Sequence, residues 1–573
     1  MSDLTIRIGG EGGEGIISAG DMIAQAAVRS GLKVLTFKSF PAEIRGGYAM
    51  YQARFSTEEI LSEGSDIEVL CVFNQEALDK NKKTIQPGSV LIYDYPGGDI
   101  EEEVKIDGVT TYNVPMSQIA KKELEMYRAK NMVALGALSQ LFDISLESLR
   151  GTIKSKFGKK GEKVVSINMN AIQAGVDYIN NSHKKTDPYK MGKADKIDED
   201  VIMISGNEAA GLGAVIAGCR FLSCYPITPA TEVAIWMSKI LPKLDGVLVQ
   251  AEDEIASLAN VIGASFAGQK AMTSTSGPGL SLMQELIGLA SMAEVPCVIV
   301  DVQRGGPSTG LPTKHEQSDL FMAAHGGHGD FSRIVLSPEN VADVIDQTVM
   351  AFNLAEKYQI PVLLLSDGSM GFRIESIKRP DPNSYEIINR ERKNGDGDYQ
   401  RYNITESGIS PMSQPGDAGG RYIATGLEHA PSSAPAFTPD AHVTQSDKRF
   451  SKLDDLEDFM PAPEVQGDDG EADLGVISWG STLGTIREAV NMAIAEGLKV
   501  KALHPKLVWP VPEKALNSFA AGCKKILIPE INKQGQLADI IRSKTGIDAI
   551  KQNVYGGLPL TPKQVLAKIK EVI

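Results

Sequence analysis

Four polar stretches in the middle of the chain carry the residue types best suited to chemistry. They are SCYPITPATE (223–232), AEDEIASLANVIGASFAG (251–268), TSTSGPG (273–279) and QRGGPSTGLPTKHEQSDL (303–320). Each accompanies an apolar run that is typical of a β-strand. Because ligand loops gather at the carboxyl ends of parallel strands, the sequence predicts that these stretches form one site.

An acidic cluster, Glu252, Asp253 and Glu254, begins the helix of the second stretch. Acidic residues in a first helical turn stabilise the helix dipole, and this explanation suffices for Glu252 and Asp253. Glu254 opens a helix whose later residues are mostly small or apolar, so its carboxyl can lie in a dry site. There it could hydrogen-bond a ligand and share a proton with it, although stabilisation of the helix dipole is the alternative for Glu254 as well.

Several residues near this cluster could bind an anionic substrate. Thr228 lies between two prolines that stiffen its loop, so its hydroxyl could donate to a carboxylate or keto oxygen, although an ordinary proline turn is the alternative. Arg304 could bind a carboxylate through two N–H groups, and Lys314 could serve as a point charge. His315 adjoins Lys314, and both could instead be solvated loop residues.

A glycine-rich stretch, GGEGGEGI, follows the first apolar run, and its Gly10, Gly12 and Gly15 satisfy G-x-G-x-x-G. Such a strand-to-helix turn presents backbone N–H groups to phosphate. Dinucleotide-binding folds carry an acidic residue about twenty positions later. Here the next strand ends with Lys38 and is followed by Arg45, which favours a ligand with several phosphates. The alternative is a turn that only packs a helix on a strand.

Strands and helices alternate along the chain, which predicts an α/β fold of three units. We expect the first unit at 1–182 with a parallel sheet, a charged linker at 183–200, the second unit at 201–376, a long polar segment at 377–464 and the third unit at 465–573. The run VIMIS is assigned to the second unit as a strand. A polar segment of this length is either functional or poorly ordered.

The composition limits the class of partner. The chain has 58 Lys and Arg against 73 Asp and Glu, a net charge of −15, which argues against nucleic acid because phosphate binding needs a basic face. The five cysteines form no C-x-x-C and lie mostly in apolar runs, as expected of buried thiols in a reducing cytoplasm. No apolar run is long enough to span a membrane.

Two patterns could suggest a metal site. His325 and His328 form H-x-x-H, but no third ligand stands nearby, so a loop or hydrogen-bonding role is favoured. The GDG at 395–397 lies in the polar segment, with no apolar strand before it and no pair of asparagines after it. It is interpreted as a turn, and no metal ligand is expected in this chain.

The motifs YPITP, the EDE helix, SGPG and GPSTGLPT occur in an order and spacing that resemble the alpha subunit of 2-oxoacid:ferredoxin oxidoreductases. The likeness is greatest to the 2-oxoglutarate-type members. GGEGGEGI and SFPAEIRGG resemble the gamma subunit of that family, fused here ahead of the alpha part. The third unit resembles the C-terminal domain of transketolase. The resemblance covers nearly the whole chain apart from the linkers.

This resemblance implies a role for each candidate residue. The second unit would be a pyrimidine-binding domain for thiamin diphosphate, with Glu254 on the aminopyrimidine ring. Thr228 would contact the 2-oxoacid, whose carboxylates would meet Arg304, Lys314 and His315. The N-terminal turn would contact coenzyme A through Gly10, Gly12, Gly13, Gly15, Lys38 and Arg45.

The activity implied is reversible oxidative decarboxylation of 2-oxoglutarate to succinyl-CoA and CO₂, with electrons passed to ferredoxin. Pyruvate or another 2-oxoacid, indolepyruvate included, is an alternative substrate. A thiamin transferase of the transketolase type is a rival, and it predicts the GDG and asparagine pair in this or a closely paired chain. A non-enzymatic nucleotide-binding scaffold is a second rival, and it predicts that Glu254→Ala leaves the activity of the complex unchanged.

The chain lacks two parts that this reaction needs. No asparagine pair follows the GDG, and the cysteines are too few to hold iron–sulfur clusters. The resemblance therefore implies a beta subunit that carries the diphosphate end of thiamin diphosphate, Mg²⁺ and at least one 4Fe–4S cluster. A dimer of alpha–beta heterodimers is expected, with ferredoxin as a further partner.

Overall fold

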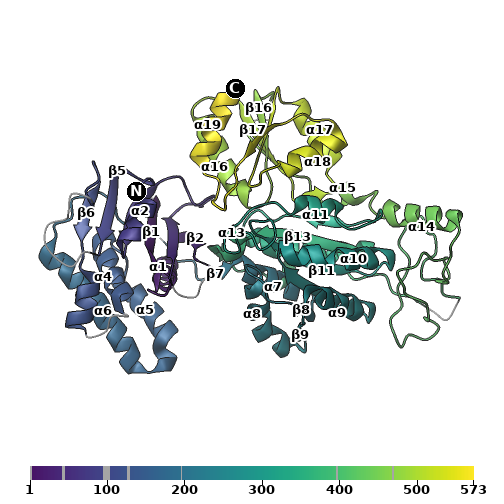
Figure 1. Cartoon of the computed structure of the whole chain (residues 1–573), viewed down its shortest axis with the longest axis horizontal. Coiled ribbons are helices and arrows are strands. Elements are labelled where there is room, and N and C mark those ends of the chain that lie inside the picture. The colour runs from purple at the N-terminus through teal and green to yellow at the C-terminus, as the bar shows by residue number, and fades with distance from the viewer. Residues whose placement is uncertain are drawn as a thin grey trace. The chain divides into compact units, whose positions relative to one another are not determined.

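A computed structural model describes residues 3–41, 46–94, 104–124, 129–194, 196–394, 398–467 and 470–573 of the chain. These residues form two compact units, Met1–Ile204 with Arg373–Arg379, and Ser205–Phe372 with Pro380–Ile573. Three sheets with helices packed on them lie within the units, which confirms the predicted α/β class (Figure 1). In the described part of the chain, no helix is both long and apolar enough to cross a membrane.

An eight-stranded sheet forms the first unit, in the order β6-β5-β4-β1-β3-β2-β14-β7. Its strands are β1 (Asp3–Glu11), β2 (Lys33–Ser39), β3 (Tyr48–Ser56), β4 (Ile67–Val72), β5 (Ile85–Tyr93), β6 (Thr110–Asn113), β7 (Val201–Ser205) and β14 (Ile374–Lys378). Its main helices are α1 (Ile16–Arg29), α2 (Gln75–Asn81), α4 (Lys130–Phe142), α5 (Leu146–Phe157) and α6 (Glu162–Ser182). Apolar residues of α1, α4 and α6 bury one core against the central strands.

The first sheet differs from the sequence prediction in two respects. It is mixed rather than parallel, because β1, β4, β5 and β6 run parallel whereas β3 is antiparallel to both β1 and β2. The run VIMIS, assigned to the second unit from the sequence, is β7 and lies at the edge of this sheet. Strand direction and edge pairing depend on backbone partners far away in the sequence, which a local pattern does not specify.

A seven-stranded sheet carries the middle of the chain, in the order β18-β12-β13-β11-β10-β8-β9. Its strands are β8 (Phe221–Cys224), β9 (Val247–Gln250), β10 (Ala271–Thr275), β11 (Cys297–Gln303), β12 (Ile334–Leu336), β13 (Pro361–Asp367) and β18 (Leu507–Trp509). Its helices are α7 (Gly206–Ile216), α8 (Thr231–Ile240), α9 (Glu254–Phe266), α10 (Gly277–Met292), α11 (Leu320–His325), α12 (Val341–Tyr358) and α13 (Gly368–Phe372). All neighbours from β9 to β12 run parallel, and β18 is antiparallel to β12.

A five-stranded sheet forms the C-terminal domain, in the order β15-β17-β16-β19-β20. Its strands are β15 (Glu464–Gln466), β16 (Leu474–Ile477), β17 (Val500–His504), β19 (Ile526–Glu530) and β20 (Ile550–Asn553). Its helices are α16 (Leu483–Ala495), α17 (Glu513–Ala521), α18 (Gln536–Thr545) and α19 (Pro562–Val572). Helices α16 and α19 cover one face of the sheet, and α17 and α18 cover the other (Figure 1).

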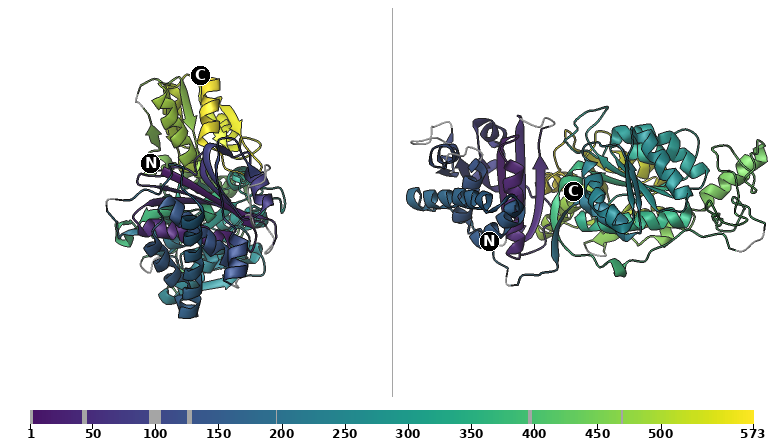
Figure 2. Two further views of the ribbon diagram at one scale, coloured as in Figure 1. Left: turned by 90° about the vertical axis from the view of Figure 1, so that its left-hand side faces the viewer. Right: turned by 90° about the horizontal axis from the view of Figure 1, so that it is seen from below.

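The polar segment that follows β14 is attached to the second unit by polar contacts, one of them a buried ion pair. It contains α14 (Pro439–Ser451) and α15 (Leu456–Phe459), and Figures 1 and 2 show α14 beside α10. Arg390 Nε donates to Glu356 Oε2 at 2.8 Å in a buried ion pair. Tyr358 Oη donates to Asp455 Oδ1 at 2.9 Å. The GDG at 395–397 lies outside the described residues.

Candidate active site

The four polar stretches lie together, as the sequence predicts. They accompany β8, β9, β10 and β11, which are neighbours in the order β9-β8-β10-β11. Because these strands run parallel, their carboxyl ends share one edge of the sheet. Helices α9 and α10 begin at this edge, so their N-termini and the loops before them face the same site.

Glu254 is the first residue of α9, and its side chain is buried against the glycines of SGPG. The residue is 6% exposed. A Cβ placed at Gly279 would lie 2.6 Å from Glu254 Cγ and 2.8 Å from its Oε1, so glycine leaves the space that the carboxyl occupies. Among the residues that the structure describes, none donates a hydrogen bond to this carboxylate. A buried acceptor needs a partner, and a bound ligand can supply it.

The other two acidic residues of the cluster have different surroundings. Asp253 is the N-cap of α9, and its Oδ1 accepts a hydrogen bond from Ala256 N at 2.7 Å. This bond satisfies one of the unpaired donors of the first turn. Glu252 is exposed, as is Asp253. The dipole and capping explanation therefore suffices for both, and Glu254 alone of the three is enclosed.

Arg304 follows β11 and contacts the loop that carries Thr228. Its Nη1 donates to the carbonyl oxygen of Thr228 at 2.7 Å. The residue is 7% exposed. Burial lowers the pKa of Arg304, while the carboxylates of Asp319 and Glu254 act to raise it, so both carboxylates are close enough to attract the guanidinium. Thr228, Glu254 and Arg304 thus form one cluster.

Two acidic residues beside Arg304 were missed by the sequence analysis. Asp301 belongs to β11, Asp319 is the N-cap residue of α11, and their carboxyl groups lie close enough to interact, although neither Asp301 oxygen has a donor among the described residues. Burial and the charge of Asp319 raise the pKa of Asp301 well above its usual range. Burial raises the pKa of Asp319 to about 7. The sequence does contain one signal for this pair, the carboxyl of Asp301 within the apolar run CVIVDVQ, because a buried carboxyl needs a partner.

Lys314 and His315 pack against different parts of the chain. A Cβ placed at Gly557 would lie 2.3 Å from Lys314 Cβ, so Lys314 packs against a loop of the C-terminal domain. His315 is 3% exposed and lies next to Gly368, whose added Cβ would be 3.3 Å from His315 Cβ and 3.5 Å from Pro229 Cγ. Of the two, His315 therefore lies next to the loop of Thr228.

The C-terminal domain fixes the chain between His315 and α11. Gln317 N donates to Ile531 O at 2.7 Å, and Gln317 Nε2 donates to Trp479 O at 2.9 Å. Gln536 Nε2 donates to Ser318 O at 2.8 Å, and Gln536 Oε1 accepts from Phe321 N at 2.9 Å. These bonds hold the backbone on both sides of Asp319.

In the first unit, the glycine-rich turn is filled by its own carboxylate. Glu14 Oε2 accepts from Glu11 N at 2.9 Å, and Glu14 Oε1 accepts from Lys130 Nζ at 3.0 Å. A Cβ at Gly10 would lie 2.8 Å from Glu14 Oε2, and one at Gly12 would lie 2.7 Å from the backbone oxygen of Gly46. Gly13 and Gly15 have φ of 101° and 82°, which favours glycine at both positions.

Lys38 lies in a small charged cluster beside α1. Its Nζ pairs with Asp21 Oδ1 at 3.0 Å. Lys156 Nζ donates to Ser18 Oγ at 2.8 Å in the first turn of α1, and the charges of Asp21 and Lys38 both act on Lys156. The sequence analysis missed Lys156, because α5 is far from the glycine turn along the chain. Arg45 lies outside the described residues.

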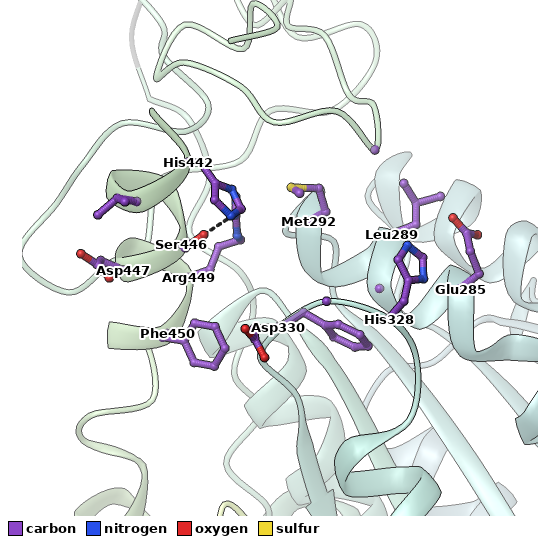
Figure 3. Close-up of a pocket in the computed structure, with 15 residues that line it drawn as sticks. Glu285, Leu289, Met292, His328, Asp330, His442, Ser446, Asp447, Arg449 and Phe450 are labelled. Atoms are coloured by element: carbon purple, nitrogen blue, oxygen red, sulfur yellow. Dashed lines mark hydrogen bonds between the residues drawn. The ribbon is translucent and has the colours of Figure 1, made fainter. Parts of the chain in front are cut away.

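A cavity of about 620 Å³ lies along the last turns of α10 and is bordered by α14 (Figure 3). Glu254 lies beside the first turn of α10, so the cavity is at the other end of this helix. His328 lines the cavity, whereas the ring of His325 packs edge-on against Trp509 with centroids 4.4 Å apart. The two histidines of H-x-x-H therefore face different surroundings. Within the described ranges, no group of three or more His, Cys, Asp or Glu is placed to hold a metal ion.

Comparisons with known proteins cover the whole length of the chain. Family models described as "Pyruvate ferredoxin/flavodoxin oxidoreductase", "Pyruvate flavodoxin/ferredoxin oxidoreductase, thiamine diP-bdg" and "Pyruvate:ferredoxin oxidoreductase core domain II" match residues 5–178, 212–448 and 472–564. The 2-oxoglutarate oxidoreductase subunit KorA of Mycobacterium tuberculosis is 33% identical over 96% of this chain and 88% of its own length. The chain belongs to the 2-oxoacid:ferredoxin oxidoreductases. The resemblance inferred from the motifs is thus confirmed, including the thiamin diphosphate-binding domain in the middle of the chain.

Two other members of this family match over full length. The 2-oxoglutarate:ferredoxin oxidoreductase of Magnetococcus marinus, solved with 2-oxoglutarate, coenzyme A and succinyl-CoA bound, is 54% identical, with a TM-score of 0.96 over 100% of both chains. The 2-oxoacid:ferredoxin oxidoreductase 2, subunit alpha, of Aeropyrum pernix is 29% identical over 100% of this chain and 98% of its own. These relatives are all named as oxidoreductases, so this chain is part of an oxidoreductase as well.

Proposed function

We propose that the chain is the alpha subunit, with a fused gamma-type domain, of a 2-oxoglutarate:ferredoxin oxidoreductase. The complex would convert 2-oxoglutarate and coenzyme A reversibly to succinyl-CoA and CO₂, and pass the electrons to ferredoxin. The observation that carries the proposal is the buried Glu254 carboxylate, which has no donor among the described residues and lies in one cluster with Arg304 and Thr228.

The residues around Glu254 fit the pyrimidine end of thiamin diphosphate. A buried carboxylate that has no donor among the described residues, beside the small SGPG turn, offers an acceptor to a donor group of the ring. When bound, the coenzyme supplies the nucleophilic carbon that attacks the keto group. Glu254 would hold the ring in place and exchange a proton with a ring nitrogen.

The cluster also fits the substrate. Arg304 uses Nη1 on the Thr228 carbonyl, and its other N–H groups can bind the carboxylate next to the keto carbon. The Thr228 hydroxyl can donate to the same carboxylate or to the keto oxygen. Our candidates for the distal carboxylate of 2-oxoglutarate are His315, which lies next to the Thr228 loop, and the preceding residue Lys314.

A beta subunit would supply what this chain lacks, namely Mg²⁺, the diphosphate contacts and at least one 4Fe–4S cluster. We expect a dimer of alpha–beta heterodimers. The chain purified from its native cell should carry a brown partner with bound thiamin diphosphate, and this complex should reduce a viologen dye with 2-oxoglutarate faster than with pyruvate. Catalysis by the isolated chain would contradict the two-subunit proposal, and turnover without an electron acceptor would identify a transferase instead.

We assign coenzyme A to the first domain, at Gly10, Gly12, Gly13, Gly15, Lys38 and Arg45. Because Glu14 fills the glycine turn, we expect the phosphates beside it, at the first turn of α1 where Lys38 and Lys156 lie.

Replacing Lys38 with alanine should raise the KM for coenzyme A about tenfold, since a charge-assisted contact to phosphate is lost. The KM for the 2-oxoacid should stay the same. Lys154 is exposed on α5, close to Lys156 in sequence, and Lys154→Ala serves as the matched control. An unchanged KM for coenzyme A in the Lys38 variant would remove Lys38 from the assignment.

A further inference from the structure

The Asp301–Asp319 pair is not used by the reaction proposed above, yet it lies beside the substrate cluster. Asp301 has no exposed surface, and in the described part of the chain neither of its carboxyl oxygens has a partner other than the carboxyl of Asp319. The other charged groups that act on the pair are Arg304 and Glu316, and Glu254 also faces Arg304.

Two neighbouring buried carboxyl groups that lack other donors can satisfy each other only if one of them holds a proton. Asp301 is the deeper group, and within the described ranges no cation acts on it. Asp319 is attracted by Arg304. The proton therefore belongs to Asp301, which donates to Asp319, and the negative charge lies on Asp319, the side that faces Arg304.

Asp319 is held rigidly in this position. A Cβ placed at Gly277 would lie 2.8 Å from both Asp319 carboxyl oxygens, so the side chain fills the space beside the first residue of α10. The N-terminus of that helix favours a negative charge. Asp319 N donates to Gln303 Oε1 at 3.1 Å, and Gln317 and Gln536 fix the backbone on either side.

The charge of Asp319 attracts Arg304, but the two side chains form no direct ion pair. Among the described residues, Arg304 forms no ion pair within contact distance, and its Nε has no hydrogen-bond partner. A fixed charge at this range can orient the guanidinium while N–H groups stay available to a ligand. Such preorganisation lowers the cost of binding an anion.

We propose that Asp301 and Asp319 form a shared-proton pair that positions the Arg304 guanidinium for the carboxylate of the 2-oxoacid. Both would be positioning residues, because neither is placed on the substrate. The inference rests on the proposed function, since it takes Arg304 as the carboxylate ligand. Asp301 fixes the carboxyl of Asp319 by hydrogen bonding, and Asp319 supplies the charge.

The pair predicts a pH dependence of substrate binding. Burial raises the pKa of Asp319 to about 7, and Arg304 opposes this rise. Above that pH the carboxylate is ionised and attracts Arg304, and below it Asp319 is neutral. The KM for the 2-oxoacid should therefore fall as the pH rises through neutrality.

Variants of the alpha–beta complex separate the two roles. Asp319→Asn should raise the KM for the 2-oxoacid about tenfold, with a smaller effect on kcat, and should abolish its pH dependence. Asp301→Asn should keep the KM within about twofold, because the amide still donates to Asp319, whereas Asp301→Leu should raise it. An Asp319→Asn enzyme with the wild-type KM and pH profile would overturn the inference, as would equal losses in the two asparagine variants.

Arg304→Ala distinguishes this inference from the proposed function on which it rests. If Arg304→Ala leaves the KM for the 2-oxoacid unchanged, the substrate assignment of Arg304 fails and the positioning role fails with it. If Arg304→Ala raises the KM but Asp319→Asn does not, only the pair is refuted. Thermal unfolding and recovery of the partner subunit show whether each variant has folded and assembled.

Discussion

Replacing Glu254 with alanine is expected to reduce 2-oxoglutarate-dependent viologen reduction by the complex about 10²- to 10⁴-fold, the usual contribution of a positioned proton-transfer group. The carboxyl is buried, lies against Gly279 and has no hydrogen-bond donor among the described residues, so we expect a bound ligand to be its partner. The loss should appear in kcat at saturating substrate and thiamin diphosphate. Initial rates with a viologen acceptor measure it.

Glu252→Ala is the matched control, because it removes the same group two residues away at an exposed position. Its rate should equal that of the wild type. Glu254→Gln keeps the size and the hydrogen-bonding capacity of the side chain but cannot exchange a proton. Its rate should therefore be reduced almost as much as that of Glu254→Ala. Wild-type activity in Glu254→Ala would support the non-enzymatic scaffold and contradict the proposed function.

The sequence could predict the place of Glu254 because the signal there is local. The carboxyl, the small-residue helix and the SGPG turn lie within one stretch of the chain, and parallel strands bring their loops to a common edge. The structure adds the physical reason for two glycines of that turn: Gly277 leaves room for Asp319, and Gly279 leaves room for Glu254.

Asp301 and Asp319 could not be paired from the sequence. They are brought together by the turn of the chain after β11, and the hydrogen bonds that fix Asp319 come from Gln317 and Gln536, the latter in the C-terminal domain. The directions of β2 and β3 are unpredictable for the same reason, since backbone pairing partners lie far apart in sequence. Local patterns thus predict which loops carry the site, and long-range packing decides which side chains support it.

The long polar segment shows how a low apolar content can still give a fixed structure. From its composition the segment could equally be unstructured. Its attachment depends on Glu294, which has no exposed surface and accepts from Lys448 Nζ at 2.6 Å, with Lys452 Nζ also 2.6 Å away. Arg401 Nη2 donates to the Glu294 backbone oxygen at 2.7 Å. All three cations come from the segment, and the single carboxylate comes from the turn that follows α10.

Replacing Glu294 with alanine should destabilise this attachment by about 3–5 kcal/mol, because three buried cations lose their counter-ion. Burial opposes ionisation of Glu294, but Lys452, Lys448 and Arg401 together hold its pKa well below the usual 4.5. Its contribution is therefore fully present above pH 4.5 and is lost only in stronger acid. Limited proteolysis at neutral pH should cut the variant between α13 and β15 much faster than the wild type, and the thermal midpoint should fall.

Glu285→Ala is the control, since Glu285 is exposed on α10, the helix that precedes Glu294, and it should change neither measurement. The charge balance gives a sharper test. Burial lowers the pKa of Lys452 to about 7, so without Glu294 this lysine can give up its proton in the folded state. A lysine whose pKa is lower in the folded state favours folding as the pH rises, and removing Glu294 lowers the pKa of Lys452 further. The deficit of Glu294→Ala should therefore shrink as the pH rises toward neutrality and level off above it. Adding Lys448→Met and Lys452→Met to Glu294→Gln should restore part of the protection from proteolysis at neutral pH. Of the four charged groups, only Arg401 then remains, and backbone oxygens still accept its hydrogen bonds. Equal proteolysis of Glu294→Ala and wild type would show that the cations do not hold the segment.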